Sequence, residues 1–221
     1  MAQLRASAKD EILSRVKNAL SDVPANETPE QLVIARNYRQ QSSEPQAEIV
    51  KLFINRLEDY NAGVHHIKET EIAATIADLC QKYTLGQLVM AADVPQAWVP
   101  EDVQAWRDEQ NQLTNEQIGE SNSAVLTGCA LAIAQTGTIV LDGGPAQGRR
   151  ALSLLPDYAF CVVREEQIVG LVTEGIRRLE KAVTQRHQPI TFISGPSATS
   201  DIELSRVVGV HGPRHLDVLI V

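Results

Sequence analysis

From residue 46 onward, segments with a helical apolar pattern alternate with short apolar segments of the β type. Helices are predicted at residues 47–60, 69–82 and 168–182, the second of them capped by Thr70. Strands are predicted at 63–67, 87–91, 158–163, 190–194 and 216–221, and two more β-type runs fill residues 124–142 with breaks at Gly128 and Gly137. Such alternation is typical of an α/β fold whose sheet is mainly parallel and covered by helices. We therefore expect a single α/β domain at residues 46–221.

Two segments of this domain lack the alternating pattern. Residues 98–117 are polar and are predicted to be irregular, with one helical turn near Val103. Residues 149–155 follow the Gly143-Gly144-Pro145 turn and are predicted to form a short helix.

Residues 1–45 are predicted to form an N-terminal arm and its connection to the domain. Ile12, Leu13 and Val16 follow helical spacing, which predicts an amphipathic helix at 6–20. Residues 21–45 contain three prolines and little periodicity, so they are expected to be a surface connection. Two interpretations of the helix stay open: it packs on its own domain, or it reaches a partner subunit.

The composition excludes several classes of protein. A net charge of −8 opposes nonspecific binding to nucleic acid, which requires a basic surface. No apolar run approaches the roughly 20 residues that span a bilayer, and the first ten residues lack the apolar centre of a signal peptide. The chain is expected to be cytoplasmic, without a membrane span.

The cysteines and histidines do not form a metal-ligand pattern. Cys80, Cys129 and Cys161 are dispersed, so we expect no iron–sulfur cluster and no other cofactor in this chain. His65 and His66 are adjacent on a predicted strand and should face opposite sides. No metal site is expected.

The strongest candidate for a ligand site is the turn at residues 194–203, which follows a predicted strand. Gly and Pro end the strand, hydroxyl side chains gather in the turn, and Asp201 is placed to start a short helix. A helix start offers backbone N–H groups to an anion, although a capped turn alone would also explain Asp201 and Gly195. The candidates in this turn are Ser194, Gly195, Ser197, Thr199, Ser200, Asp201 and Glu203.

Three further segments supply candidate residues. Thr136, Gly137 and Thr138 stand where two β-type runs meet, and their hydroxyls could reach a ligand, or they could be strand residues beside a bulge. Arg149 and Arg150 follow a glycine-rich loop that lacks the spacing of a nucleotide-binding motif; either could bind an anion or remain solvated.

A second turn at 209–214 adds His211 and Arg214 as acid–base or anion-binding candidates. Because ligands in parallel α/β sheets usually lie beyond the carboxyl ends of strands, these segments are predicted to converge there on one pocket. No catalytic set is apparent.

Four segments in this order also resemble the LUD-domain family: 134–140, 148–156, 194–203 and 209–214. The resemblance implies a fold akin to the sugar-phosphate isomerase and CoA-transferase group. It also implies a role in bacterial L-lactate oxidation alongside iron–sulfur lactate utilization proteins, which would hold the clusters. One departure is Gln135, where many relatives are expected to have an acidic residue.

Three functions follow from these observations. The first is a component of an L-lactate utilization system that binds a small anionic ligand, with its own catalytic contribution left open. The second is an independent enzyme that acts on a phosphorylated or CoA-linked small molecule, although Gln135 removes one possible nucleophilic carboxylate. The third is a scaffold or regulator whose turns are structural.

Overall fold

The computed structural model describes residues 7–23, 28, 35, 37–185, 187–199, 207–208 and 212–221. The chain divides into two compact units, residues 1–38 and 39–221. In the first unit, helix α1 (Ala8–Ala19) begins with a capping box. The Asp10 N–H donates to Ser7 Oγ at 3.3 Å and the Ser7 N–H donates to the Asp10 carboxylate at 3.2 Å, which satisfies two N–H groups that have no partner within the helix. This helix corresponds to the one predicted at 6–20.

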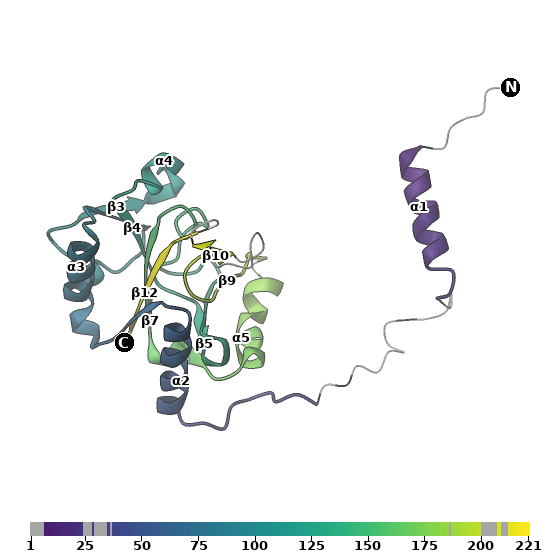
Figure 1. The fold of residues 1–221 in the computed structure, drawn as a ribbon, viewed down its shortest axis with the longest axis horizontal. Coiled ribbons are helices and arrows are strands. Elements are labelled where there is room, and N and C mark those ends of the chain that lie inside the picture. The colour runs from purple at the N-terminus through teal and green to yellow at the C-terminus, as the bar shows by residue number, and fades with distance from the viewer. Residues whose placement is uncertain are drawn as a thin grey trace. The chain divides into compact units, whose positions relative to one another are not determined.

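A parallel sheet of six strands forms the centre of the second unit (Figure 1). Its strands, in spatial order, are β1 (Gly63–His66), β12 (His215–Ile220), β7 (Tyr158–Val163), β4 (Ser123–Thr127), β2 (Gln87–Ala91) and β3 (Gln104–Asp108). All five neighbouring pairs are parallel. The predicted α/β class with a mainly parallel sheet is confirmed.

A smaller sheet of four strands packs beside the first. Its spatial order is β8 (Ile168–Val169), β5 (Leu131–Ile133), β6 (Thr138–Leu141) and β9 (Thr191–Ile193). The β5–β6 and β6–β9 pairs are antiparallel, whereas β5–β8 is parallel. A further antiparallel pair joins β10 (Ala198–Thr199) to β11 (Val207–Val208).

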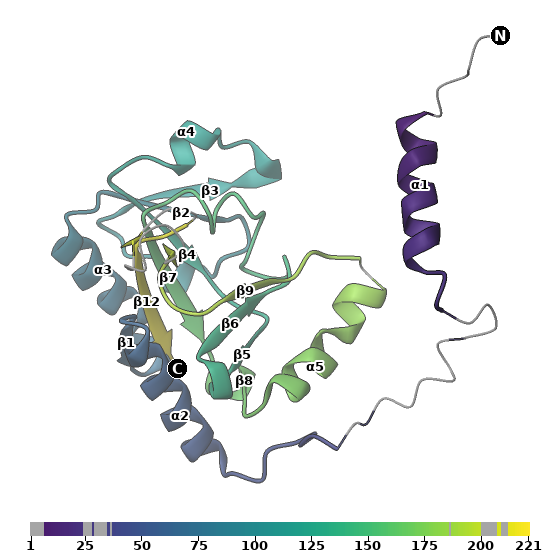
Figure 2. The same ribbon diagram turned by 45° about the vertical axis from the view of Figure 1, so that its right-hand side comes forward.

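Helices cover these sheets on both sides. Figures 1 and 2 show α3 (Ile72–Tyr83) on one side of the larger sheet, and the smaller sheet with α5 (Val172–Thr184) on the other. Helix α2 (Gln46–Asp59) contacts β1, β8 and the 3-10 turn η5 (Ala134–Thr136). Short turns complete the connections: η2 (Glu69–Glu71), η3 (Gln96–Trp98), η4 (Glu109–Asn111), α4 (Asn115–Ile118) and η6 (Glu165–Gln167).

Side-chain alternation in β6 explains why the smaller sheet has two apolar faces. Ile139 and Leu141 belong to the main core, which also contains the fully buried Phe53 and Phe160. Val140, between them in sequence, points to a second cluster with Leu179 of α5. The smaller sheet is therefore a middle layer between the larger sheet and α5.

Four local predictions are wrong. The polar segment 98–117 contains β3, an edge strand whose side chains range from exposed at Gln104 to buried at Asp108 and give no apolar pattern. Residues 149–155 form successive turns rather than a helix. The helix predicted at 168–182 starts too early, since Ile168–Val169 form β8 and α5 begins at Val172. The prediction included these two residues because they continue the apolar pattern of α5. Thr70 lies within η2 and does not cap α3.

Residues 39–44 are held against the start of α5. Thr173 Oγ1 donates to the Arg39 carbonyl at 3.0 Å, and the Ser42 N–H donates to the Glu174 carboxylate at 3.1 Å. Across the described ranges of the chain, no helix has the length and apolar character needed to cross a bilayer.

Candidate functional site

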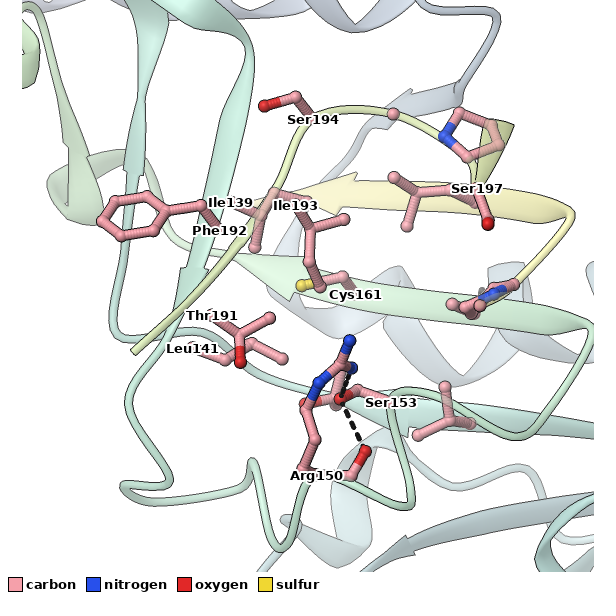
Figure 3. Close-up of a pocket in the computed structure, with 18 residues that line it drawn as sticks. Ile139, Leu141, Arg150, Ser153, Cys161, Thr191, Phe192, Ile193, Ser194 and Ser197 are labelled. Carbon is pink, nitrogen blue, oxygen red and sulfur yellow. Dashed lines mark hydrogen bonds between the residues drawn. The ribbon is translucent and has the colours of Figure 1, made fainter. Parts of the chain in front are cut away.

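A cavity of about 230 Å³ lies between the two sheets (Figure 3). Val125, Cys161 and Leu216 line it from the larger sheet, and Ile139 and Ile193 line it from the smaller one. The cavity is therefore between the sheets and not beyond the carboxyl ends of the parallel strands, where a pocket was expected.

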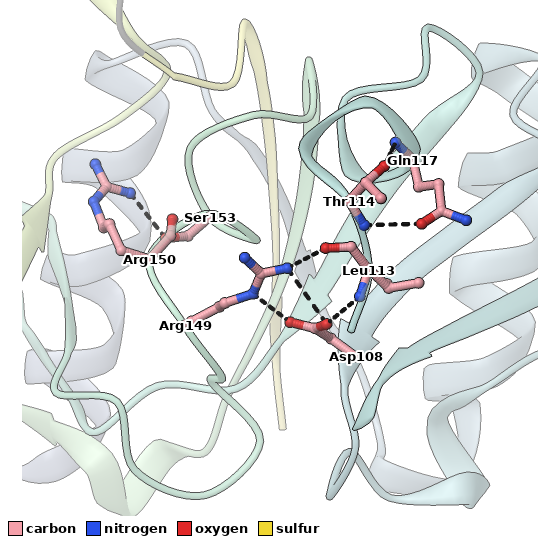
Figure 4. A network of polar contacts seen from close by, with 7 residues as sticks. All are labelled: Asp108, Leu113, Thr114, Gln117, Arg149, Arg150 and Ser153. Carbon is pink, nitrogen blue, oxygen red and sulfur yellow. Dashed lines mark hydrogen bonds and ion pairs between the residues drawn. The ribbon is translucent and has the colours of Figure 1, made fainter. Parts of the chain in front are cut away.

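Arg150 is the one charged side chain among the described residues that line this cavity. Its guanidinium donates to Ser153 Oγ at 2.8 Å, and Ser153 Oγ donates to the Arg150 carbonyl at 3.2 Å (Figures 3 and 4). In the part of the chain that the structure describes, no carboxylate pairs with Arg150. Because a guanidinium has five N–H donors, Arg150 retains donors and an uncompensated positive charge for an anion.

Hydroxyl groups from the predicted turn meet the same cavity. Ser194 and Ser197 line it, and the Ser197 N–H donates to the Pro213 carbonyl at 2.8 Å, which joins this turn to the segment before β12. Ser194 Oγ hydrogen-bonds Thr138 Oγ1 at 2.8 Å, and Thr138 Oγ1 hydrogen-bonds Thr136 Oγ1 at 2.7 Å. Thr138 thus reaches the cavity through Ser194 and does not itself line it.

A second hollow of about 260 Å³ continues the cavity, because the two share Leu141, Arg150, Ser153 and Thr191. Gln188 lines this extension, and its Oε1 is buried without a hydrogen-bond partner among the described residues. A buried acceptor that lacks a hydrogen-bond donor destabilises the folded protein. A bound ligand or water that donates to Gln188 Oε1 would remove this cost. We call the cavity and its extension the Arg150 cleft.

A family model for the LUD domain matches residues 50–221. The chain belongs to the LUD domain family. The lactate utilization protein C of Deinococcus radiodurans is 42% identical over 219 residues, which cover 98% of this chain and 96% of the relative. The lactate utilization protein C of Halalkalibacterium halodurans is 28% identical over 188 residues, 76% of this chain and 81% of the relative.

A solved structure extends this likeness to three dimensions. The crystal structure of a DUF162 family protein from Deinococcus radiodurans has a TM-score of 0.69 and 38% sequence identity. The match covers 80% of this chain and 98% of the crystallised one.

Two glycines of this LUD domain are required by close packing against α2. A Cβ on Gly137 (φ +59°) would lie 2.7 Å from Arg56 Cβ, and one on Gly195 (φ +80°) would lie 2.5 Å from Tyr60 Cβ. Arg56 and Tyr60 are four residues apart, so they share one side at the carboxyl end of α2. Gly195 also lines the cleft, whereas Thr136 and Gly137 lie against α2 outside it.

Arg149 and Arg214 are engaged in ion pairs. Arg149 Nε donates to Asp108 Oδ2 at 2.6 Å, and its NH2 group also donates to the Leu113 carbonyl (Figure 4). The Asp108 side chain is only 1% exposed, so this pair joins the end of β3 to the 142–150 loop. Arg214 Nε lies 3.4 Å from Asp157 Oδ1 with both side chains about half exposed.

The remaining candidates fall largely outside the described residues. Ser200, Asp201, Glu203 and His211 lie outside the described residues, and Thr199 is described only as part of β10. Gly212 and Pro213 show that the second turn reaches the cleft. The sequence interpretation missed Ser153 and Gln188; Ser153 could have been found from its spacing of three after Arg150, but nothing in the sequence marks Gln188.

The histidines and cysteines contact partners other than metals. His65 Nε2 lies 2.8 Å from the buried Asp217 Oδ1, and His66 Nε2 lies 2.8 Å from Glu165 Oε1, so the two rings face different partners as expected. No group of three or more His, Cys, Asp or Glu among the described residues is arranged to hold a metal ion. Burial raises the pKa of the Cys80 thiol to about 11, with a smaller effect from Asp102.

Proposed function

We propose that this LUD domain protein serves in L-lactate utilization and binds a small carboxylate, L-lactate itself or its oxidised product, in the Arg150 cleft. The relatives named lactate utilization protein C support the process. The single observation that supports the ligand is the uncompensated Arg150 guanidinium beside Ser153 in a cavity of about 230 Å³. The extension, which Arg150 and Gln188 both line, is about 260 Å³, below the roughly 300–1,000 Å³ of pockets for drug-sized ligands, and this favours a small metabolite.

Gln188 supports a preference for a hydroxy acid over a keto acid. Its Oε1 needs a donor, and the hydroxyl of L-lactate can donate whereas the carbonyl of pyruvate cannot. Arg150 and Gln188 both line the extension, so L-lactate bound there would place its carboxylate at Arg150 and its adjacent hydroxyl toward Gln188. We therefore propose that L-lactate binds more tightly than pyruvate, and that Gln188→Leu removes most of this difference.

We also propose that the protein acts alongside iron–sulfur partner proteins, which would carry out the electron transfer. Exposed apolar side chains on α5 and β9, namely Ile176, Val183 and Phe192, support a partner surface. They surround an apolar groove of about 460 Å³ on α5.

Calorimetry with L-lactate and pyruvate tests the ligand proposal. Arg150→Gln should weaken binding by roughly tenfold to a hundredfold, the size expected for losing a charge-assisted hydrogen bond. The matched control is Arg56→Gln on α2, whose side chain is about half exposed and lines neither the cleft nor the apolar groove on α5. In a strain that lacks the gene, the control should restore growth on L-lactate and Arg150→Gln should not. Equal growth with both variants would refute the role of Arg150.

A further inference from the structure

A second cavity, of about 460 Å³, opens at the carboxyl edge of the larger sheet. It is lined by Asp93, which follows β2, by Gly128 and Cys129, which follow β4, and by Arg164, which follows β7. This cavity is separate from the Arg150 cleft. Among the described lining residues the two share only Asp142 and Gln147, which form part of the wall between this cavity and the cleft's extension.

The position of this cavity follows from the order of the strands. From β2 the chain continues to β3, on one side of β2, whereas from β4 it next enters the larger sheet at β7, on the opposite side. Neighbouring strands β2 and β4 therefore send their connections in opposite directions. In open α/β sheets, the crevice outside the carboxyl ends of such a pair is the usual place for a ligand.

Two arginines supply the positive charge of this cavity. Arg178 of α5 donates to the Glu166 carbonyl at 3.2 Å and has no carboxylate partner in the described parts of the chain. Arg164 pairs with Glu69 at 2.8 Å, but these side chains are 35% and 61% exposed, so the pair is weak and can exchange for a ligand. Both guanidinium groups are thus available to an anion.

The carboxylates of the wall are occupied by hydrogen-bond donors of the wall itself. Asp93 Oδ2 accepts the Ala146 N–H at 2.9 Å. Asp142 Oδ1 accepts the Gly144 N–H at 3.0 Å and the Gln147 side-chain amide at 3.1 Å. These contacts fix the 142–147 loop over the sheet edge and stabilise both carboxylates, while Arg164 and Arg178 supply the opposing positive charge.

Apart from Gln147 and Gln167, the rest of the described wall is apolar. Trp98 is 6% exposed, and a Cβ on Gly128 would lie within 4 Å of both the Trp98 ring and Ala146. Apolar walls with a few polar groups are typical of pockets for organic ligands, and this volume is within their usual range. An organic molecule fits such a cavity better than a bare ion.

We propose that this cavity is a second ligand site, which binds an organic anion through a phosphate or carboxylate group held by Arg164 and Arg178. The two arginines approach from different elements, the end of β7 and the middle of α5. A ligand bound to both would tie α5 to the larger sheet. Citrate and glycerol 3-phosphate are suitable probes because they carry the two kinds of anionic group on an organic frame.

Calorimetry on the full chain tests this site. At least one probe should bind with a dissociation constant of about 1 mM or lower, and Arg178→Gln and Arg164→Gln should each weaken it by roughly tenfold or more. Binding of citrate alone identifies a carboxylate ligand, and binding of glycerol 3-phosphate alone identifies a phosphate ligand. Arg177→Gln, one residue along α5, is the matched control and should bind as wild type does.

The outcome for Arg150→Gln separates this site from the Arg150 cleft. The proposal requires that this variant bind the probe normally, whatever its effect on L-lactate. Loss of probe binding in Arg150→Gln, no binding of either probe at about 10 mM, or unchanged binding in both Arg164→Gln and Arg178→Gln would overturn it. Thermal unfolding of each variant shows whether it has folded, and all of the substituted arginines are at least partly exposed.

Discussion

Arg149 and Arg150 are adjacent in sequence but have different partners. Arg149 is bound to the buried Asp108 carboxylate, which also accepts the Leu113 N–H at 2.9 Å (Figure 4). Among the described residues, the Arg150 side chain hydrogen-bonds only Ser153. Removing Arg149 leaves a buried charge without its counterion, whereas removing Arg150 leaves none.

We predict that Arg149→Gln lowers the free energy of unfolding by about 1.5–3 kcal/mol, less than for a fully buried pair because Arg149 is 29% exposed. Arg150→Gln should change it by no more than about 0.5 kcal/mol. Urea denaturation of both variants measures the difference. Equal losses of stability would contradict the assignment of a structural role to Arg149 alone.

The sequence identified both arginines as candidate anion-binding residues, but it did not show which of them forms a structural ion pair. Asp108 is 41 residues away from Arg149 and ends β3, a polar strand that the apolar pattern did not reveal. Without that strand, nothing placed a buried carboxylate near the glycine-rich loop. Ser194, Gly195 and Ser197 were more accessible to prediction, because a strand-ending turn with hydroxyl side chains is a local signal.

Helix α2 explains two of the glycines that the family resemblance singles out. Gly137 and Gly195 both have positive φ and both approach its carboxyl end, at Arg56 and Tyr60. The packing of this one helix thus orders the β5–β6 connection and the turn after β9 together. The hydroxyl chain from Thr136 through Thr138 to Ser194 runs between the same two segments.

We predict that Gly137→Ala and Gly195→Ala each reduce the free energy of unfolding by about 1–3 kcal/mol. An alanine side chain is strained at positive φ, and its Cβ would force the nearby atoms of Arg56 or Tyr60 on α2 to shift. Gly86→Ala is the control, because its nearest contact is Asn122 Nδ2 at 3.4 Å. Its effect should not exceed about 1 kcal/mol. Chemical denaturation measures all three variants, and a neutral Gly195→Ala would show that Tyr60 does not constrain the turn.

At the scale of elements, alternation of apolar patterns predicted the larger sheet apart from β3, but it did not predict the smaller sheet as a separate layer. Residues 124–142 were predicted to be β structure, yet whether those runs joined the parallel sheet was not encoded locally. Ile139 and Leu141 face one core and Val140 faces another, so β6 gives an unbroken apolar run instead of an amphipathic one. The cavity between the sheets could not be predicted without this second layer.

At the scale of the whole molecule, the residue 39–221 unit buries all three cysteines. Cys80, Cys129 and Cys161 are buried, and Cys161 also lines the Arg150 cleft. A hydrogen bond with the Cys161 thiol, together with burial, raises the pKa of the Cys129 thiol well above its usual value. Because the thiolate is the reactive form, both Cys80 and Cys129 should be unreactive at neutral pH while the protein stays folded.

These thiols also predict how stability depends on pH. The pKa of the Cys80 thiol is 9.0 in the unfolded chain and is raised to about 11 in the folded protein. The stability that this difference contributes is fully present below pH 9.0 and is lost as the pH rises toward about 11. The free energy of unfolding should therefore fall between about pH 8 and pH 10, and fall less in Cys80→Ala.

Denaturation at both pH values measures this difference, and labelling with a thiol reagent at about pH 8 gives an independent test. Cys80 and Cys129 should react only at the rate at which the protein opens, and denaturant should expose both at once. Rapid labelling of Cys129 in the folded protein, with mass spectrometry to locate the site, would show that the carboxyl edge of the larger sheet opens without global unfolding.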